Sequence, residues 1–166
     1  ECWGFGGIDA EHGDSIMGAA LDAGINFIDT ADVYSNGDSE VLLGGALAKG
    51  GRRDRVVLAS KGLGRMGTGV NDTGLSRLYL TRACERSLQR LKTDRIDLYQ
   101  IHGFDAATPL DEVARALEDL VRSGKVVYTG ICNLAAWQLA LLLGSLPPGN
   151  PARPVSAQMY YSLIGR

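Results

Sequence analysis

The chain has 166 residues, of which 45% are hydrophobic and 22% are charged, and its formal net charge is −2. This length and composition are typical of one globular domain with a real core, so we expect residues 1–166 to form a single domain. The near-neutral charge lacks the basic footprint of a nucleic-acid-binding protein. No apolar run is long enough for a membrane span, so we expect no membrane partner.

The cysteines and histidines are few. Cys2, Cys84 and Cys132 are odd in number and widely spaced, which argues against a disulfide framework or a zinc site. Such cysteines fit a reducing compartment best, and we therefore expect a cytoplasmic protein. His12 and His102 are the two histidines, which leaves little material for metal chemistry, and we predict no metal site.

Both ends of the sequence have features of cuts. The chain starts at Glu1 without Met, and Arg166 follows an apolar run that has no stop signal. We expect a longer protein on both sides. The run Trp3–Gly6 is typical of the tail of a strand that enters a turn.

Helical and strand patterns alternate strictly along the chain. We predict helices over 10–23, 39–48, 76–91, 109–123 and 134–143, and strands over 25–29, 56–59, 96–101 and 126–131, with a last short strand ending near Gln158. Ser39 is the predicted N-cap of the second helix. The helix at 134–143 is apolar nearly all round and should be well covered. Repeats of about 30 to 40 residues with this alternation indicate βαβ units and a parallel sheet.

Each predicted strand ends on a polar side chain. In chain order these ends are Asp29, Lys61, His102, Asn133 and Gln158, with Tyr34 a few residues after the first. In parallel α/β folds the carboxyl ends of successive strands converge, and the chemistry lies there. We therefore expect these side chains to meet.

The predicted group has the composition of an acid–base site. A phenol has an ordinary pKa near 10, and a nearby ammonium favours the phenolate and lowers such a value. A carboxylate beside the ammonium keeps it charged and in place, and a histidine donor can orient a carbonyl oxygen. Together such groups make a general acid that protonates an oxygen while a hydride reaches the carbon.

Simpler interpretations exist for each residue by itself. Asp29 could cap the following turn, Tyr34 could be an amphipathic surface ring, and His102 could be structural. Cys132 could be a reactive thiol, although a small buried hydrophobe is favoured. The run Gly62–Gly67 matches GxGxxG, but the polar residues 68–74 that follow cannot open a helix at once, so a loop is favoured over a Rossmann site.

The sequence resembles the aldo-keto reductase family, and in particular the bacterial branch that is similar to potassium-channel β subunits. The matching stretches are 24–34, 39–44, 58–61, 87–102, 124–126 and 160–163. The resemblance implies a (β/α)8 TIM barrel with NADPH across its carboxyl face and a small carbonyl compound as substrate. At most six strands are present here, so the barrel would be incomplete. The oligomeric state is not readable.

The resemblance also implies a role for each strand end. Tyr34 would be the general acid, Lys61 its cationic partner, Asp29 the ion-pair partner of that lysine, and His102 the donor that orients the substrate. Asn133 and Gln158 would hold the nicotinamide carboxamide, with Asp29 and Cys132 beside them. The family usually has Ser where this chain has Cys132, and a thiol is a weaker hydrogen-bond donor than a hydroxyl.

The missing part of the barrel would contain some of the cofactor-binding residues. In the family, the last two βα units carry the site for the adenosine 2′-phosphate and the ring that stacks on nicotinamide, and no residue of this chain matches either role. The leading hypothesis is an NADPH-dependent carbonyl reductase. A nucleotide-sensing regulatory subunit and a non-catalytic remnant that completes its sheet by oligomerising are the alternatives.

Overall fold

The structure is a computed structural model that describes residues 9–165. Its strands form one five-stranded sheet in the order β1-β2-β3-β4-β5, and every neighbouring pair is parallel. The strands are β1 (Phe27–Asp29), β2 (Val57–Gly62), β3 (Ile96–Ile101), β4 (Val126–Cys132) and β5 (Ser156–Gln158). The predicted parallel sheet is confirmed as part of an incomplete (β/α)8 barrel. The strand expected at Trp3–Gly6 lies outside the described residues.

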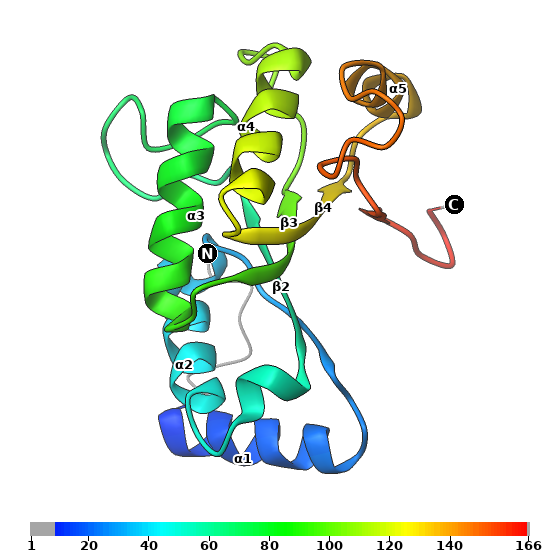
Figure 1. Cartoon of the computed structure of the whole chain (residues 1–166). Coiled ribbons are helices and arrows are strands. Elements are labelled where there is room, and N and C mark those ends of the chain that lie inside the picture. The colour runs from blue at the N-terminus through cyan, green and yellow to red at the C-terminus, as the bar shows by residue number, and fades with distance from the viewer. Residues whose placement is uncertain (1–8, 166) are drawn as a thin grey trace.

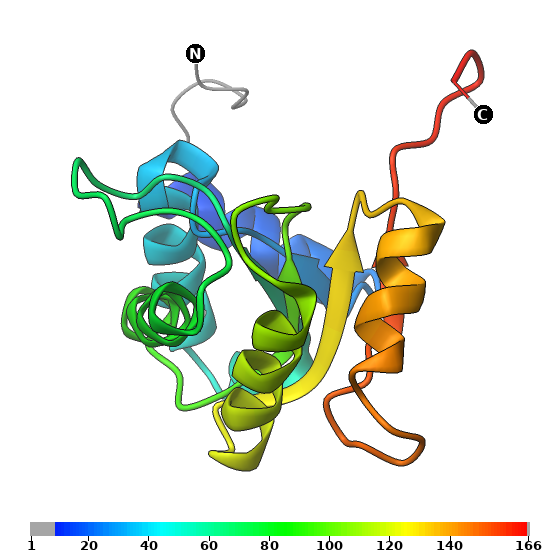
Figure 2. The same ribbon diagram turned by 90° about the horizontal axis from the view of Figure 1, so that it is seen from above.

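Helices connect the strands and lie in an arc around one face of the sheet (Figures 1 and 2). They are α1 (Ala10–Asp22), α2 (Asp38–Leu47), α3 (Arg77–Leu91), α4 (Leu110–Arg122) and α5 (Ala136–Gly144), with 3-10 turns at Tyr34–Gly37 and Arg52–Arg55. Helix α1 packs against α2, α2 against α3, α3 against α4, and α4 against α5. The main core lies between this arc and the strands. Among the described residues, no helix is both long and apolar enough to cross a bilayer.

The core follows from the period of each element. Helix α3 turns an apolar or small stripe inward at every third or fourth position, as a helix of 3.6 residues per turn requires. Strands contribute apolar side chains from their helix-facing side. The buried set includes Leu58, Leu80, Cys84, Leu91, Ile96, Ile101, Val113, Leu117, Leu120 and Ile131.

The opposite face of the sheet has no helix over it in the described part of the chain (Figure 2). Phe27 on β1, Val57 on β2 and Tyr128 on β4 are therefore exposed although they lie inside strands. In a closed barrel such a face would point at the opposite strands. The site described below lies at the carboxyl edge of this same face.

Three local predictions were wrong. Ser39 lies inside α2, whose N-cap is Gly37 in the left-handed conformation, and the Ser39 hydroxyl bonds instead to the hydroxyl of Thr30 at 2.9 Å. Helix α4 begins at Leu110, with Pro109 as its N-cap rather than its first helical residue. Helix α5 is not covered all round: Trp137 is 59% exposed, because α5 packs on α4 through one side only.

Candidate active site

The site begins with a row of residues that face one another across the sheet. Lys61 of β2 pairs in register with Gln100 of β3, which pairs with Gly130 of β4, which pairs with Ser156 of β5. Partners in register on parallel strands point to the same face. One sheet row therefore brings together an ammonium, an amide and a hydroxyl, with a glycine between the last two.

Lys61 lies at the centre of the site and is only 1% exposed. Its Nζ lies 2.5 Å from Asp29 Oδ2, and it donates hydrogen bonds to the carbonyl of Thr30 at 3.0 Å and to the hydroxyl oxygen of Tyr34 at 3.2 Å. An ammonium has three donors, so all three are satisfied. Lys61 therefore holds the Tyr34 oxygen as a hydrogen-bond acceptor, and the Tyr34 hydroxyl proton points away from the lysine.

Asp29 is held by two amides as well as by the lysine. Gln100 donates to Asp29 Oδ1 at 3.4 Å and Gln158 to Oδ2 at 3.5 Å, while the Ser156 hydroxyl donates to the Gln100 amide oxygen at 3.3 Å. Gly130 leaves space for this series of hydrogen bonds, because a Cβ there would lie 2.3 Å from Ser156 Oγ. The carboxylate is therefore oriented from three strands.

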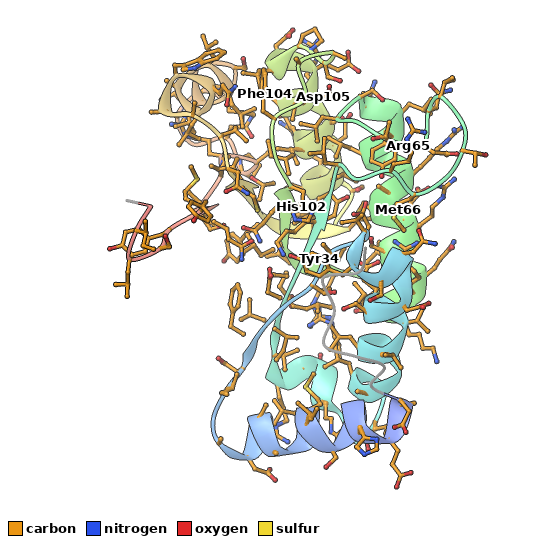
Figure 3. The ribbon with its side chains drawn as sticks, turned by 180° about the vertical axis from the view of Figure 1, so that it is seen from behind. Tyr34, Arg65, Met66, His102, Phe104 and Asp105 are labelled. Carbon is orange, nitrogen blue, oxygen red and sulfur yellow. The ribbon has the colours of Figure 1, made fainter. Side chains whose placement is uncertain are left out.

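His102 follows β3 and lies edge-on to the ring of Tyr34, with 5.7 Å between the ring centroids (Figure 3). Burial lowers its pKa, and the Lys61 ammonium lowers it further, while Asp29 acts in the opposite direction. The imidazole is therefore neutral at pH 7, and a neutral imidazole has one N–H donor. It is suited to donating a hydrogen bond beside the phenol.

The remaining predicted residues line a pocket of ≈ 250 Å³. Asn133 follows β4 in the left-handed conformation, and its Oδ1 accepts the backbone N–H of Tyr160 at 2.9 Å. The thiol of Cys132 donates to the amide oxygen of Gln158 at 3.4 Å. Burial raises the Cys132 pKa to about 11, so the thiol stays protonated at neutral pH. The full lining is Tyr34, His102, Cys132, Asn133, Gln158, Met159 and Tyr160.

All of the predicted site residues therefore meet at one edge of the sheet. Sequence reasoning missed Gln100 and Ser156, which orient Asp29 through the chain described above. A signal for Gln100 was present, because an amide inside a buried, mostly apolar strand needs a polar partner. Ser156 had no such signal, since strand β5 is short and exposed. In the part of the chain that the structure describes, no cluster of three or more His, Cys, Asp or Glu side chains could hold a metal.

An incomplete parallel barrel with ionisable groups gathered at its carboxyl edge defines the class as a (β/α)8-barrel protein. A family model described as "Aldo/keto reductase family" matches residues 2–166. The chain belongs to the aldo/keto reductase family.

Individual relatives agree with this assignment. An uncharacterized oxidoreductase, YrpG of Bacillus subtilis (strain 168), is 43% identical over 160 residues, covering 91% of this chain and 49% of that protein. A probable voltage-gated potassium channel subunit beta of Arabidopsis thaliana is 33% identical and covers 96% of this chain and 48% of its own length. The chain thus spans about half the length of these curated relatives.

A solved structure gives the same result for the fold. Aldo-keto reductase AKR11C1 from Bacillus halodurans, in its holo form, matches with a TM-score of 0.80 and 37% sequence identity. The match covers 94% of this chain and 50% of that one. The five-stranded sheet is therefore one half of a barrel of this family.

Proposed function

We propose that the protein containing this chain reduces an aldehyde or a ketone to an alcohol, with NADPH as cofactor. The observation that supports this most is the chain of contacts Asp29–Lys61–Tyr34, which ends in a phenol at the pocket. A nicotinamide cofactor, when bound, supplies a hydride to the carbonyl carbon. The chain's own residues supply the proton, the orientation and the charge.

Tyr34 acts as the general acid in this proposal. Its oxygen accepts a hydrogen bond from Lys61, so its proton is free to pass to a carbonyl oxygen in the pocket. The ammonium stabilises the phenolate that remains, and Asp29 keeps the ammonium in place. Because Lys61 is buried, this charge interaction is little screened by water.

His102 orients the substrate. Its neutral imidazole lies beside the phenol ring, so its N–H and the Tyr34 hydroxyl can both reach one carbonyl oxygen. Two donors directed at the oxygen favour the charge that develops there in the transition state. A mixed pocket of this volume fits a small carbonyl compound.

The described residues also fit the nicotinamide end of the cofactor. A carboxamide needs a donor and an acceptor, and Asn133 and Gln158, whose amides carry both groups, line the pocket. The contact of the Gln158 amide nitrogen to Asp29 is long, 3.5 Å, and a thiol is a weak donor to its oxygen, so the amide can exchange these contacts for a ligand. Asn133 and Gln158 would hold the carboxamide, and Asp29 and Cys132 would position Gln158.

The test is Tyr34→Phe in the complete protein. We expect kcat for aldehyde reduction to fall by about 10²- to 10⁴-fold, which is the usual contribution of a general acid. The affinity for NADPH, measured by fluorescence titration, should stay within about threefold because the ring remains. Ser145→Ala is the control, since it also removes one hydroxyl, at an exposed position after α5 that does not line the pocket. Unchanged turnover in Tyr34→Phe would remove the proposed mechanism.

A second function rests on the relatives described as potassium channel β subunits. A regulatory subunit of that kind would bind the nucleotide and a partner protein and turn over very slowly. Multiple-turnover reduction of an aldehyde by the purified protein would favour the reductase. A single turnover, with tight nucleotide binding, would favour the regulatory subunit.

A further inference from the structure

A second carboxyl lies three residues after Asp29, outside the proposed chemistry. Asp32 is 0% exposed and lies on the segment that joins β1 to Tyr34. Its backbone N–H donates to the carbonyl of Lys61 at 3.1 Å. One carboxyl oxygen, Oδ1, has no hydrogen-bond partner among the described residues, and the other, Oδ2, lies 3.3 Å from the hydroxyl of Tyr79 on α3.

The position of one proton follows from the contacts of Tyr79. Its hydroxyl also lies within hydrogen-bond distance of the carbonyl oxygen of Gly64. A backbone carbonyl has no proton, so this bond requires the Tyr79 hydroxyl to be the donor. A phenol has a single proton to donate. With that proton directed at Gly64, the 3.3 Å contact between Tyr79 and Asp32 can be a second hydrogen bond when Asp32 carries a proton of its own.

The surrounding charges agree with a neutral Asp32. Arg90 on α3 donates to Glu40 of α2 at 2.7 Å, and the Ser60 hydroxyl of β2 donates to the same carboxylate at 2.5 Å. Arg90 is therefore occupied by Glu40, which is itself 0% exposed and repels a second negative charge. No salt bridge joins Asp32 to any cation of the described residues.

The ionisation of Asp32 is shifted in the same direction. Burial first and the Glu40 carboxylate second raise its pKa, the Val33 backbone N–H, the Tyr79 hydroxyl and the Arg90 guanidinium lower it, and the net result is a pKa of about 7. Tyr99 of β3 also lies close to these groups, fully buried, with its own pKa raised by burial and therefore neutral. An uncompensated buried carboxylate is costly, so the neutral acid is favoured.

The contacts of Asp32 join two loops at the site. Gly64 belongs to the loop after β2, and its backbone lies so close to Val33 that a Cβ there would be 2.8 Å from the Val33 Cβ. The chain Asp32–Tyr79–Gly64 therefore ties that loop, and α3, to the segment that ends at Tyr34. The Tyr79–Gly64 bond uses the proton of the phenol, and the Asp32–Tyr79 bond uses the proton of Asp32, so both bonds exist together only when Asp32 is protonated.

We propose that Asp32 is a neutral carboxylic acid that donates a hydrogen bond to Tyr79, and that this proton positions the Tyr34 loop. Asp32 is thus a positioning residue, and only its consequence for catalysis rests on the proposed function. When Asp32 ionises, its proton leaves to solvent, the single proton of Tyr79 can no longer supply both Gly64 and Asp32, and two carboxylates repel each other behind the loop. The position of Tyr34 then depends on pH.

The protonation is tested by NMR on the complete protein with ¹³C-labelled Asp and Tyr. The Asp32 Cγ signal should titrate with a midpoint near neutral pH, and the Tyr34 ring signals should move with the same midpoint. Both changes should be absent in Asp32→Asn, whose amide keeps a donor for Tyr79. The control Asp38→Asn, on the exposed first turn of α2, should keep both. If Asp32 titrates near the ordinary pKa of about 3.9 for an aspartate, the proposal that it is protonated near neutral pH is wrong. If the Tyr34 ring signals do not change as Asp32 titrates, the proposal that Asp32 positions the Tyr34 loop is wrong.

The pH dependence of unfolding provides a second measurement. The pKa of Asp32 is higher in the folded chain, so the folded state binds more protons between about pH 4 and about pH 7, and its stability falls as the pH rises through that window. This fall should be missing in Asp32→Asn. An equal slope in both proteins would contradict the proposal. None of these readouts needs reductase activity, so a failure of the proposed function remains distinguishable.

Discussion

Asp29 and Asp32 lie three residues apart and have opposite environments. The Asp29 side chain is 28% exposed, faces the pocket and lies 2.5 Å from a lysine. Asp32 is fully buried, faces α3 and has no cation of its own. Two identical side chains on one short segment thus hold a negative charge in one case and a proton in the other. The difference lies entirely in the groups that other elements bring to each.

The backbone explains why the two carboxyls face different ways. The segment after β1 stays paired with β2, since Thr30 donates to the carbonyl of Ala59 and Asp32 to that of Lys61. Successive residues of an extended chain point to opposite sides. Asp29 is therefore on the open face with Lys61, and Asp32 is on the face that the helices cover.

The largest expected effect comes from removing the cation of the exposed carboxyl. Lys61→Met should lower kcat for carbonyl reduction by about 10²-fold or more. The Tyr34 phenolate would lose the cation that stabilises it, and Asp29 would lose the ion pair that orients it. Lys49→Met is the matched control, since Lys49 is exposed, forms an ion pair with Asp14 and does not line the pocket. Steady-state kinetics with a saturating aldehyde measure both. Activity within about threefold of the unchanged protein would contradict the role of Lys61.

The second prediction concerns the cation near the buried carboxyl Asp32. Arg90→Met leaves Glu40 buried beside Asp32 without a positive partner, which should cost about 3–5 kcal/mol of unfolding free energy at neutral pH. The cost should shrink in acid, where Glu40 can take up a proton. Arg86→Met is the control: Arg86 lies on the same helix, 3.8 Å from Asp72, and its side chain is 44% exposed. Denaturant unfolding of that control should show a loss of at most about 1 kcal/mol of unfolding free energy. An equal loss in both variants would contradict a special role of Arg90 beside Glu40.

The smallest effect is expected at Cys132. Its thiol donates to Gln158, which in turn donates to Asp29, so it touches the exposed carboxyl only through another side chain. Cys132→Ser supplies a stronger donor at nearly the same place. We expect kcat/KM to change by less than about threefold, measured with the same aldehyde. A change above about tenfold would indicate that Cys132 contacts a ligand directly.

The sequence by itself determined the polar strand ends and the order of elements. Mostly apolar strands that end on Asp29, Lys61, His102, Asn133 and Gln158 can be recognised from local patterning alone, and parallel strands place their carboxyl ends together. Helix α3 and strand β3 also match their predicted ranges closely, because a long apolar stripe and a short, mostly apolar run are strong local signals. The Ser39 N-cap and the coverage of α5 failed because each depends on contacts with other elements.

Only the tertiary structure decided which groups each carboxyl meets. Asp29 contacts Lys61, Gln100 and Gln158. Asp32 contacts Tyr79 and lies near the charge of Glu40, and all of these residues belong to other elements of the fold. Nothing in the local sequence of residues 29–32 distinguishes a carboxylate from a carboxylic acid there. Burial and neighbouring charge set the free energy of ionisation, and both exist only after the strands and helices have packed.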